Sequence, residues 1–404
     1  MDHGSRLLIY SHDSFGLGHL RRCRTIAHHL VDRFKHLSVL ILSGSPIIGS
    51  FDFRSRVDFV RVPGVIKLKD GGYTSLKLRL GIDEMLEIRR SIIHHTAEMF
   101  APDVFLVDKE PLGLRGEVRS TLELLKARGT RCILGLRDVM DEPASLVDEW
   151  QRKTVFPALA ELYDEIWVYG LPQIFDPLAE IPGMAAFADK VRFTGYLRRT
   201  APDHGGPMLE HRVPEEPFIL VTPGGGGDGA ELIDWVIGAY ESDPAIPWRA
   251  VILFGPFMPV EQRLAFQERV ARDPRLVAIT FEARVESLFE RASGVVAMGG
   301  YNTFCEILSF GKPALLVPRT TPRLEQYLRA ERAQALGLVR MLPNDGTRSP
   351  ARMAACLEAL PDLAVPGEEE RATMLQGLDR IADLIEPWLA PRAQVHELRR
   401  SRYA

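Results

Sequence analysis

Four stretches of the sequence place glycines and polar side chains between a predicted strand and a predicted helix. The first stretch, 11–19, reads SHDSFGLGH. Its glycines, Gly16 and Gly18, permit a tight turn and a close approach of the backbone to a ligand. The helix that begins near His19 would direct its free N–H groups at that ligand. Because an imidazole titrates near neutral pH, His19 is a candidate general base.

The alternative for this first stretch is a plain turn between a strand and a helix, with His19 as a polar residue at the helix start. Its glycine spacing does not match the GxGxxG fingerprint of dinucleotide-binding folds. Taken alone, the stretch therefore leaves both interpretations open.

The second stretch, 222–229, contains four consecutive glycines and reads TPGGGGDG. Consecutive glycines cost backbone entropy, so they are expected where the chain must bend tightly or approach a ligand. The helix predicted from about Ala230 would present its N-terminus to an anion such as a diphosphate. No Lys-Ser or Lys-Thr pair follows, which excludes a Walker A loop. The alternative is a flexible loop without a ligand.

The third stretch, 298–306, reads MGGYNTFCE. Here a strand ends, glycines turn the chain and a helix starts. The carboxylate of Glu306 can accept two hydrogen bonds from a ribose diol. The spacing of Thr303 and Glu306 equally fits a capping box at the helix start.

The fourth stretch, 317–327, reads VPRTTPRLEQY and follows another predicted strand. Glu325 and Gln326 at the start of the next helix can bind sugar hydroxyls. The simpler interpretation is a solvated first turn, where an acidic residue suits the helix dipole. The spacing alone favours this simpler interpretation.

Two further charged residues, Asp108 and Arg137, follow predicted strands and are either acceptor-binding groups or solvated strand-end charges. The adjacent histidine pairs 28–29 and 94–95 point to different helix faces, so no shared metal is expected. The sequence contains no HExxH, DxD or GxSxG motif. It therefore predicts neither metal catalysis nor a serine hydrolase.

Short, continuously apolar runs alternate with helical patterns along the whole chain, as in parallel sheets that are covered on both faces. The stretch 201–217 is rich in proline, glycine and charge and is typical of a linker. The predicted fold class is α/β: two doubly wound, Rossmann-like domains, 1–200 and 218–404, that face each other across a cleft. The last helices, with Trp388 as a packing anchor, are placed to return to the first domain. The predicted strands are 7–10, 38–42, 57–62, 104–107, 132–136, 166–169, 191–194, 218–222, 250–254, 277–280, 294–298 and 314–318.

The composition of the 404 residues is that of an ordinary globular protein, with 46% hydrophobic and 26% charged residues. The formal net charge of −4 argues against a nucleic-acid partner. Four scattered cysteines predict neither a disulfide framework nor a zinc site. No signal peptide or membrane-spanning run is visible, so a cytoplasmic location is expected. The basic and apolar stretch 77–93 is either an ordinary packed helix or a peripheral membrane contact.

The set of motifs resembles the GT-B glycosyltransferases, and among them the MurG-like group with the glycosyltransferase family 28 C-terminal domain. The resemblance covers most of the chain and is strongest over 277–342. It implies that Glu306 binds the nucleotide ribose. It also implies that the turn beside the phosphates consists of Gly299, Gly300, Asn302 and Thr303. Glu325 and Gln326 would contact the donor sugar. Phe281 and Val285 would frame a uracil. Glu282 stands where the family has an apolar residue.

In the same comparison, the tetraglycine stretch (Gly224, Gly225, Gly226) matches the family's glycine-rich loop. The short interdomain segment Gly195–Arg199 places Arg199 where the family has an arginine near the phosphates. The loop that contains Gly16 and Gly18 resembles the family's glycine loop before the catalytic histidine. This implies that His19 is the base, with Asp13 as its rival.

The resemblance implies an inverting, metal-independent transfer of a sugar from a UDP-sugar to a hydroxyl acceptor, without a cofactor. A lipid-linked acceptor is one option by analogy. Two other functions fit the same fold: a nucleotide-sugar 2-epimerase, which needs no acceptor, and a non-catalytic nucleotide-sugar-binding subunit.

Overall fold

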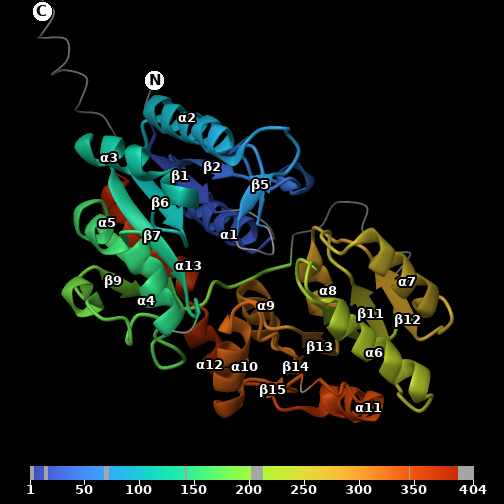
Figure 1. The fold of residues 1–404 in the computed structure, drawn as a ribbon. Helices are drawn as coiled ribbons and strands as arrows, with labels where there is room; N and C mark the ends of the chain where they lie inside the picture. Colours follow the sequence, from blue (N-terminus) through green and yellow to red (C-terminus); the bar gives the residue numbers. More distant parts are fainter. Residues whose placement is uncertain are drawn as a thin grey trace, which may run out of the picture.

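The computed structural model describes residues 4–12, 17–67, 72–141, 143–201, 213–344 and 346–389. Within these residues, the chain forms two large parallel sheets with helices on both faces (Figure 1). The predicted α/β class with two doubly wound, Rossmann-like domains is therefore confirmed. Most of the predicted linker, 202–212, lies outside the described residues.

The first domain contains a seven-stranded sheet of order β3-β2-β1-β6-β7-β8-β9, in which all neighbouring strands are parallel. The strand order reverses between β1 and β6, which is where doubly wound sheets bind ligands beyond their carboxyl ends. The strands are β1 (Arg6–Ser11), β2 (Ser38–Ser43), β3 (Val57–Arg61), β6 (Val104–Asp108), β7 (Arg131–Arg137), β8 (Glu165–Tyr169) and β9 (Val191–Phe193). The helices are α1 (Gly18–Arg33), α2 (Ile82–Phe100), α3 (Arg119–Ala127), α4 (Pro143–Arg152) and α5 (Val155–Glu161).

The second domain contains a six-stranded parallel sheet of order β12-β11-β10-β13-β14-β15. Its order reverses between β10 and β13, the two strands that precede the second and third glycine stretches. The strands are β10 (Phe218–Thr222), β11 (Arg249–Leu253), β12 (Leu276–Ile279), β13 (Gly294–Ala297), β14 (Ala314–Leu316) and β15 (Arg340–Met341). The helices are α6 (Ala230–Ser242), α7 (Val260–Val270), α8 (Val285–Arg291), α9 (Tyr301–Phe310), α10 (Glu325–Ala335), α11 (Pro350–Ala359), α12 (Glu368–Met374) and α13 (Gly377–Ile385).

Every predicted strand is present, with ends that differ by one or two residues. The sequence analysis missed β15 and an antiparallel hairpin of β4 (Val65–Lys67) and β5 (Tyr73–Ser75), because strands of two or three residues show no periodicity. Short 3₁₀ turns complete the fold at Ile48–Ser50, Leu114–Gly116, Met184–Phe187, Leu360–Asp362 and Glu386–Trp388.

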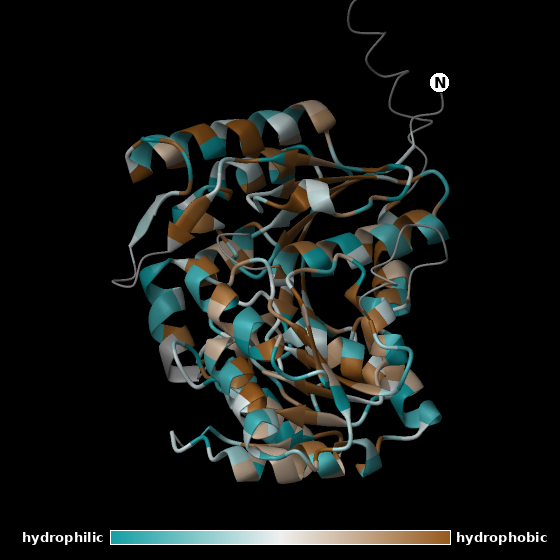
Figure 2. Cartoon of the chain, turned by 90° about the vertical axis from the view of Figure 1, so that its right-hand side faces the viewer, coloured by the Kyte–Doolittle hydropathy of each residue, from teal (hydrophilic) through white to brown (hydrophobic). Residues whose placement is uncertain are grey.

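The strands are the most apolar part of the molecule, while the helices alternate between hydrophilic and hydrophobic residues (Figure 2). In α1 the residues that face the sheet recur at helical spacing and are buried. In α2, Met85, Leu86 and Ile93 are buried, so the stretch 77–93 contributes a packed helix. No helix in the described parts of the chain combines the length and the apolar character that a membrane span requires.

The last helices return to the first domain, where the red end of the chain lies beside α1 in Figure 1. Helix α13 packs against α1. Trp388 stacks on the buried Trp167 of β8, with ring centroids 6.5 Å apart. Apolar residues of both domains consequently belong to one continuous core cluster.

A buried ion pair also joins the two domains. Arg329 of α10 donates from Nε and Nη2 to the two carboxylate oxygens of Asp138, at 2.8 and 2.6 Å. Both residues are 0% exposed. Arg329 also donates to the carbonyl of Gly299 at 2.9 Å, so this guanidinium connects the first domain to a glycine turn of the second.

We predict that Arg329→Ala lowers the free energy of unfolding by about 3–5 kcal/mol, because it leaves Asp138 buried without a counter-charge. Arg332→Ala is the matched control, since Arg332 lies on the same helix, is exposed and donates only to two backbone carbonyls. Urea denaturation measures both variants. Equal losses in the two variants would show that the buried pair contributes no more to the free energy of unfolding than the exposed arginine does.

Candidate functional site

A cavity of about 460 Å³ lies between the carboxyl edges of the two sheets, and both domains line it. Its wall combines the start of α1 with the glycine turns after β10 and β13. Thirteen of the predicted site residues line it: Gly18, His19, Gly224, Gly225, Phe281, Val285, Gly299, Gly300, Asn302, Thr303, Glu306, Glu325 and Gln326. The four stretches that the sequence analysis singled out thus meet in one place.

Two predicted residues, Asp13 and Gly16, lie outside the described residues. Gly226 is described but does not line the cavity. With φ at +88° it turns inward, and a Cβ there would lie 2.2 Å from the carbonyl oxygen of Phe254. Gly226 is therefore required for packing against the backbone of the neighbouring strand end, and its predicted contact with a donor has no support from its position.

The turn after β13 brings backbone N–H groups to the cavity. Gly299 adopts φ +81°, and Gly300 is the N-cap of α9. The first amides of a helix have no intrahelical partner, so those of Tyr301, Asn302 and Thr303 are available to an anion. Thr303 is the third residue of α9, and the N-cap has no side-chain hydrogen bond. The capping-box interpretation of Thr303 and Glu306 is therefore wrong.

Glu306 lies in the second turn of α9 and is 1% exposed. Its carboxylate accepts a short hydrogen bond from Arg21 of α1, which also donates to Glu286 at 2.8 Å. Burial, together with the neighbouring Glu286, raises the pKa of Glu306, whereas Arg21 opposes this shift. Two carboxylates of the second domain thus share one guanidinium of the first.

The start of α1 carries a histidine–carboxylate pair. His19 Nδ1 lies 2.5 Å from Asp108 Oδ2, and Arg22 donates to both oxygens of Asp108 at 2.8 and 2.6 Å. Asp108 is the last residue of β6, next to β1 at the point where the strand order reverses. Asp108 is fully buried, so the interpretation of a solvated strand-end charge is wrong.

The partners of His19 determine which ring nitrogen is free. Asp108 Oδ2 lies 2.5 Å from Nδ1 and can only accept, whereas Arg22 Nη2 lies 3.1 Å from Nδ1 and can only donate. The shorter contact favours a neutral imidazole with its proton on Nδ1, which leaves Nε2 as an acceptor. Burial lowers the pKa of His19 to about 4, although the Asp108 carboxylate acts in the opposite direction. His19 is consequently neutral at physiological pH, which is the state that a general base requires.

Arg137, at the end of β7, reaches the cavity without a partner. Its Nε is buried and makes no hydrogen bond among the described residues. Burial lowers the pKa of Arg137 to about 10, and Glu325 partly offsets this effect. A guanidinium that reaches the cavity and whose Nε makes no hydrogen bond among the described residues is a candidate ligand for a phosphate or a carboxylate.

Glu325 and Gln326 begin α10 and are only 4% and 8% exposed, so they do not form the solvated first turn that the spacing alone favoured. Arg319 holds this corner together: it donates to Glu325 Oε1 at 2.6 Å and pairs with Asp228 at 2.7 Å. The second oxygen of Glu325, Oε2, is buried and has no partner among the described residues.

The predicted phosphate contact of Arg199 also has no support from its position. Arg199 does not line this cavity. Its guanidinium donates to Asn302 Oδ1 at 2.7 Å and to Thr25, and the Asn302 amide donates to the carbonyl of Gly18 at 3.0 Å. Arg199 therefore positions Asn302, which bridges the domains.

Sequence reasoning missed the roles of Arg21, Arg22 and Arg319. One signal for Arg22 existed: it stands four residues before Ile26 on the buried stripe of α1, where a charged side chain needs a buried partner. Groups of three or more potential metal ligands do not occur among the described residues.

A comparison with known protein families identifies the second domain. Residues 218–383 match the glycosyltransferase family 28 C-terminal domain. No curated protein sequence matches the chain. Among solved structures, the chain resembles the glycotransferase of kitacinnamycin, with 17% identity, a TM-score of 0.61 and coverage of 96% of this chain and 99% of that one.

Two other solved structures are similar to the chain, and one of them contains ligands. MurG of Acinetobacter baumannii is 13% identical, with a TM-score of 0.57 and coverage of 95% and 99% of the two chains. UGT2 of Phytolacca americana, solved with UDP-2fluoro-glucose and pterostilbene, is 16% identical, with a TM-score of 0.62 and the same coverage. At these identities the likeness establishes a common fold.

We predict that the His19 imidazole remains neutral down to about pH 4, because burial disfavours its charged form. Histidine-selective NMR of the whole chain measures this titration, and the spectrum of His19→Gln assigns the resonance. A His19 pKa near the ordinary value of about 6.5 would contradict the buried geometry.

Proposed function

We propose that the chain, whose fold is that of GT-B glycosyltransferases and whose residues 218–383 match the glycosyltransferase family 28 C-terminal domain, transfers a sugar from a UDP-sugar to an acceptor hydroxyl. The main support is the cavity itself, in which backbone amides, a buried carboxylate and a neutral histidine face one space. The UDP-sugar complex of a structural neighbour supports the same donor class.

In this proposal, the second domain binds the donor. The amides at the start of α9 and the turn at Gly224 and Gly225 bind the diphosphate, and Glu306 accepts the ribose hydroxyls. Phe281 and Val285 frame the base. Phe281 packs edge-on against Phe51 of the first domain, with ring centroids 6.0 Å apart, which gives the base an aromatic boundary from both domains.

Glu325 and Gln326 bind the hydroxyls of the donor sugar. The free oxygen of Glu325 supports this role, because a buried carboxylate oxygen without a partner favours a ligand hydroxyl that donates to it. Arg319 keeps the other oxygen engaged and so fixes the orientation of the carboxylate.

His19 acts as the general base. Its Nε2 removes the proton of the acceptor hydroxyl while that oxygen attacks the anomeric carbon and the bond to the diphosphate breaks, which inverts the configuration. Asp108 holds the Nδ1 proton and stabilises the imidazolium that forms. Arg22 acts as a positioning residue, because its two bonds to Asp108 keep that carboxylate in place.

The leaving diphosphate gains negative charge, and this chain offers groups that compensate for it without a metal. The α9 amides and the glycine turn are preorganised donors. Arg137 adds a full positive charge from the first domain, and its missing partner supports this assignment. The acceptor then lies on the side of the first domain; a lipid-linked hydroxyl acceptor is one option, in analogy with MurG.

We predict that Glu306→Gln weakens the binding of UDP by about 1–3 kcal/mol, because the charge-assisted hydrogen bonds to the ribose are lost. Titration calorimetry measures the affinity. Glu290→Gln is the matched control, since Glu290 is an exposed residue of α8 outside the cavity. Unchanged affinity in the Glu306 variant would reject its role at the ribose.

We predict that His19→Ala lowers the turnover by roughly 10²–10⁴-fold while the affinity for the donor is nearly unchanged. Asp108→Asn should lower turnover as well, since the amide can donate to Nδ1 and so favour the wrong tautomer. Full activity of His19→Ala would exclude His19 as the base and direct attention to Asp13.

Incubation with UDP-GlcNAc alone separates transfer from epimerisation. A transferase leaves this donor intact until an acceptor is added. Prompt formation of an epimer would overturn the proposal in favour of a 2-epimerase. Calorimetric binding of donors without turnover across a panel of acceptors would instead favour a non-catalytic binding subunit.

A further inference from the structure

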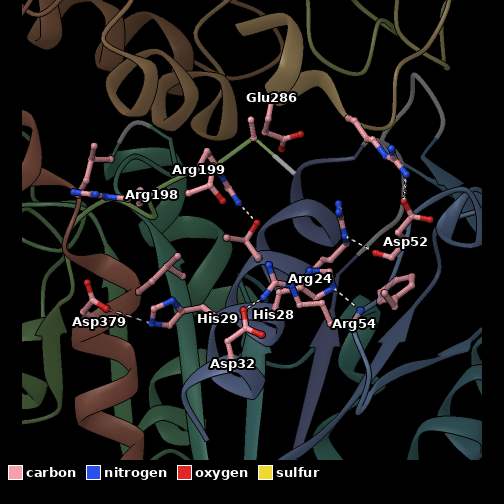
Figure 3. Close-up of a pocket in the computed structure, with 17 residues that line it drawn as sticks. Arg24, His28, His29, Asp32, Asp52, Arg54, Arg198, Arg199, Glu286 and Asp379 are labelled. Atoms are coloured by element: carbon pink, nitrogen blue, oxygen red, sulfur yellow. Dashed lines mark hydrogen bonds and ion pairs between the residues drawn. The ribbon is translucent and has the colours of Figure 1, made fainter. Parts of the chain in front are cut away.

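A second cavity, of about 590 Å³, lies between the domains further along α1. Figure 3 shows its charged wall, in which Arg198 and Arg199 of the interdomain segment face Arg24, His28 and His29 of α1. The cavity falls in the size range of small-molecule sites, roughly 300–1,000 Å³.

The carboxylates of this second cavity are already engaged. Asp32 pairs with Arg54, and Asp52 pairs with Arg284 at 3.0 Å. Glu286 pairs with Arg21 at 2.8 Å, and Asp379 lies 3.4 Å from His29. Arginines therefore compensate the charges of Asp32, Asp52 and Glu286, whereas Asp379 faces His29, whose pKa is lowered by burial.

Three guanidinium groups of the same wall have no carboxylate partner among the described residues: Arg24, Arg198 and Arg199. Arg24 donates only to the backbone carbonyl of Asp52, at 3.0 Å. Arg199 is 5% exposed, and its Nε makes no hydrogen bond among the described residues. An unmet donor on a buried guanidinium favours a ligand that accepts from it.

The electrostatics of the wall agree with this geometry. Burial and the cations Arg24 and Arg54 lower the pKa of His28 to about 3. Burial, with the nearby Arg21 and Arg199, also lowers the pKa of Arg24. In both shifts the neighbouring cations add to the effect of burial, and an anion bound beside these groups would oppose it.

We propose that this second cavity is a binding site for a small phosphorylated ligand, whose phosphate group is held by Arg24, Arg198 and Arg199. Guanidinium groups bind phosphate oxygens in a bidentate manner, which explains why arginines rather than lysines line the wall. Phe53, Leu375 and Leu378 provide an apolar surface for the rest of the ligand.

The second cavity is separate from the first cavity of about 460 Å³, here called the donor cavity, but the two share part of a wall. Arg199 binds the second ligand on one side and Asn302 on the other, and Glu286 pairs with Arg21, which lines the donor cavity. The proposal does not depend on the identity of the donor, because none of the three phosphate-binding arginines lines the donor cavity.

Calorimetric titration with inorganic pyrophosphate tests the site. Arg198→Gln is the main variant, since the exposed Arg198 side chain makes no hydrogen bond or ion pair with the described residues. We expect Arg198→Gln and Arg24→Gln each to weaken one pyrophosphate site about tenfold or more, as for the loss of a charge-assisted hydrogen bond. Thermal denaturation without ligand checks that both variants are folded.

Two control variants show whether the lost pyrophosphate binding belongs to the second cavity. Arg272→Gln, an exposed arginine at the end of α7, removes the same charge elsewhere and should leave binding unchanged. Arg319→Gln lies in the donor cavity and should leave the second site unchanged. Pyrophosphate binding that Arg319→Gln abolishes and that neither Arg24→Gln nor Arg198→Gln affects would overturn the proposal.

Sedimentation with phosphatidylcholine vesicles, with and without phosphatidic acid, identifies the source of the phosphate. Binding to the acidic vesicles that Arg198→Gln abolishes would support the site and assign it to a lipid headgroup. Arg198-dependent binding of pyrophosphate without vesicle binding would support the site and assign it to a soluble phosphate. Absence of any Arg198-dependent binding in both arms would overturn the proposal.

Discussion

The buried pair of Arg329 and Asp138 is the contact on which the candidate site depends, because neither domain forms the cavity alone. The guanidinium is fully buried, lies between the two sheets and also binds the carbonyl of Gly299. A buried charge cannot lose its partner without a large cost. Opening the cleft at this pair would therefore separate Asp138 from the guanidinium that also binds the turn after β13.

Helix α1 contributes residues to the core and to both cavities. Its buried stripe packs on the first sheet and on α13, while His19 and Arg21 face the donor cavity and Arg24 and His28 face the second cavity. Residues three or four apart share a face, so Arg21, Arg24 and His28 follow one side of α1, and the two cavities adjoin successive turns of the same helix.

The backbone of this protein was largely predictable from its sequence. Continuous apolar runs indicated the parallel strands, and the glycine stretches indicated where strands end at the site. The proposed ribose-binding role of Glu306 and the candidate base His19 followed from these turns and from the family resemblance. The glycines have a distinctive pattern because few other residues adopt φ near +81° or +84°, as Gly299 and Gly224 do.

Side-chain directions across the cleft were not predictable. Arg21 reaches Glu306 across 285 residues, and Arg22 reaches Asp108 across 86, so no local spacing indicates either pair. Arg199 follows the family motif but points toward Asn302 and the second cavity. In the sequence Gly226 is indistinguishable from its neighbouring glycines, and only the structure shows that it packs against the backbone of Phe254. The contacts of Arg21 and Arg199 depend on how the two domains meet, and those of Arg22 and Gly226 on how distant segments pack within one domain, so no local sequence pattern encodes them.

A crystal structure of the chain soaked with UDP tests the central claim most directly, since that claim places a nucleoside diphosphate between the two sheet edges. The account predicts density for the two phosphates over the turns that follow β10 and β13, with the ribose on the carboxylate of Glu306. Density for UDP at any other place, with the turns empty, would contradict the account.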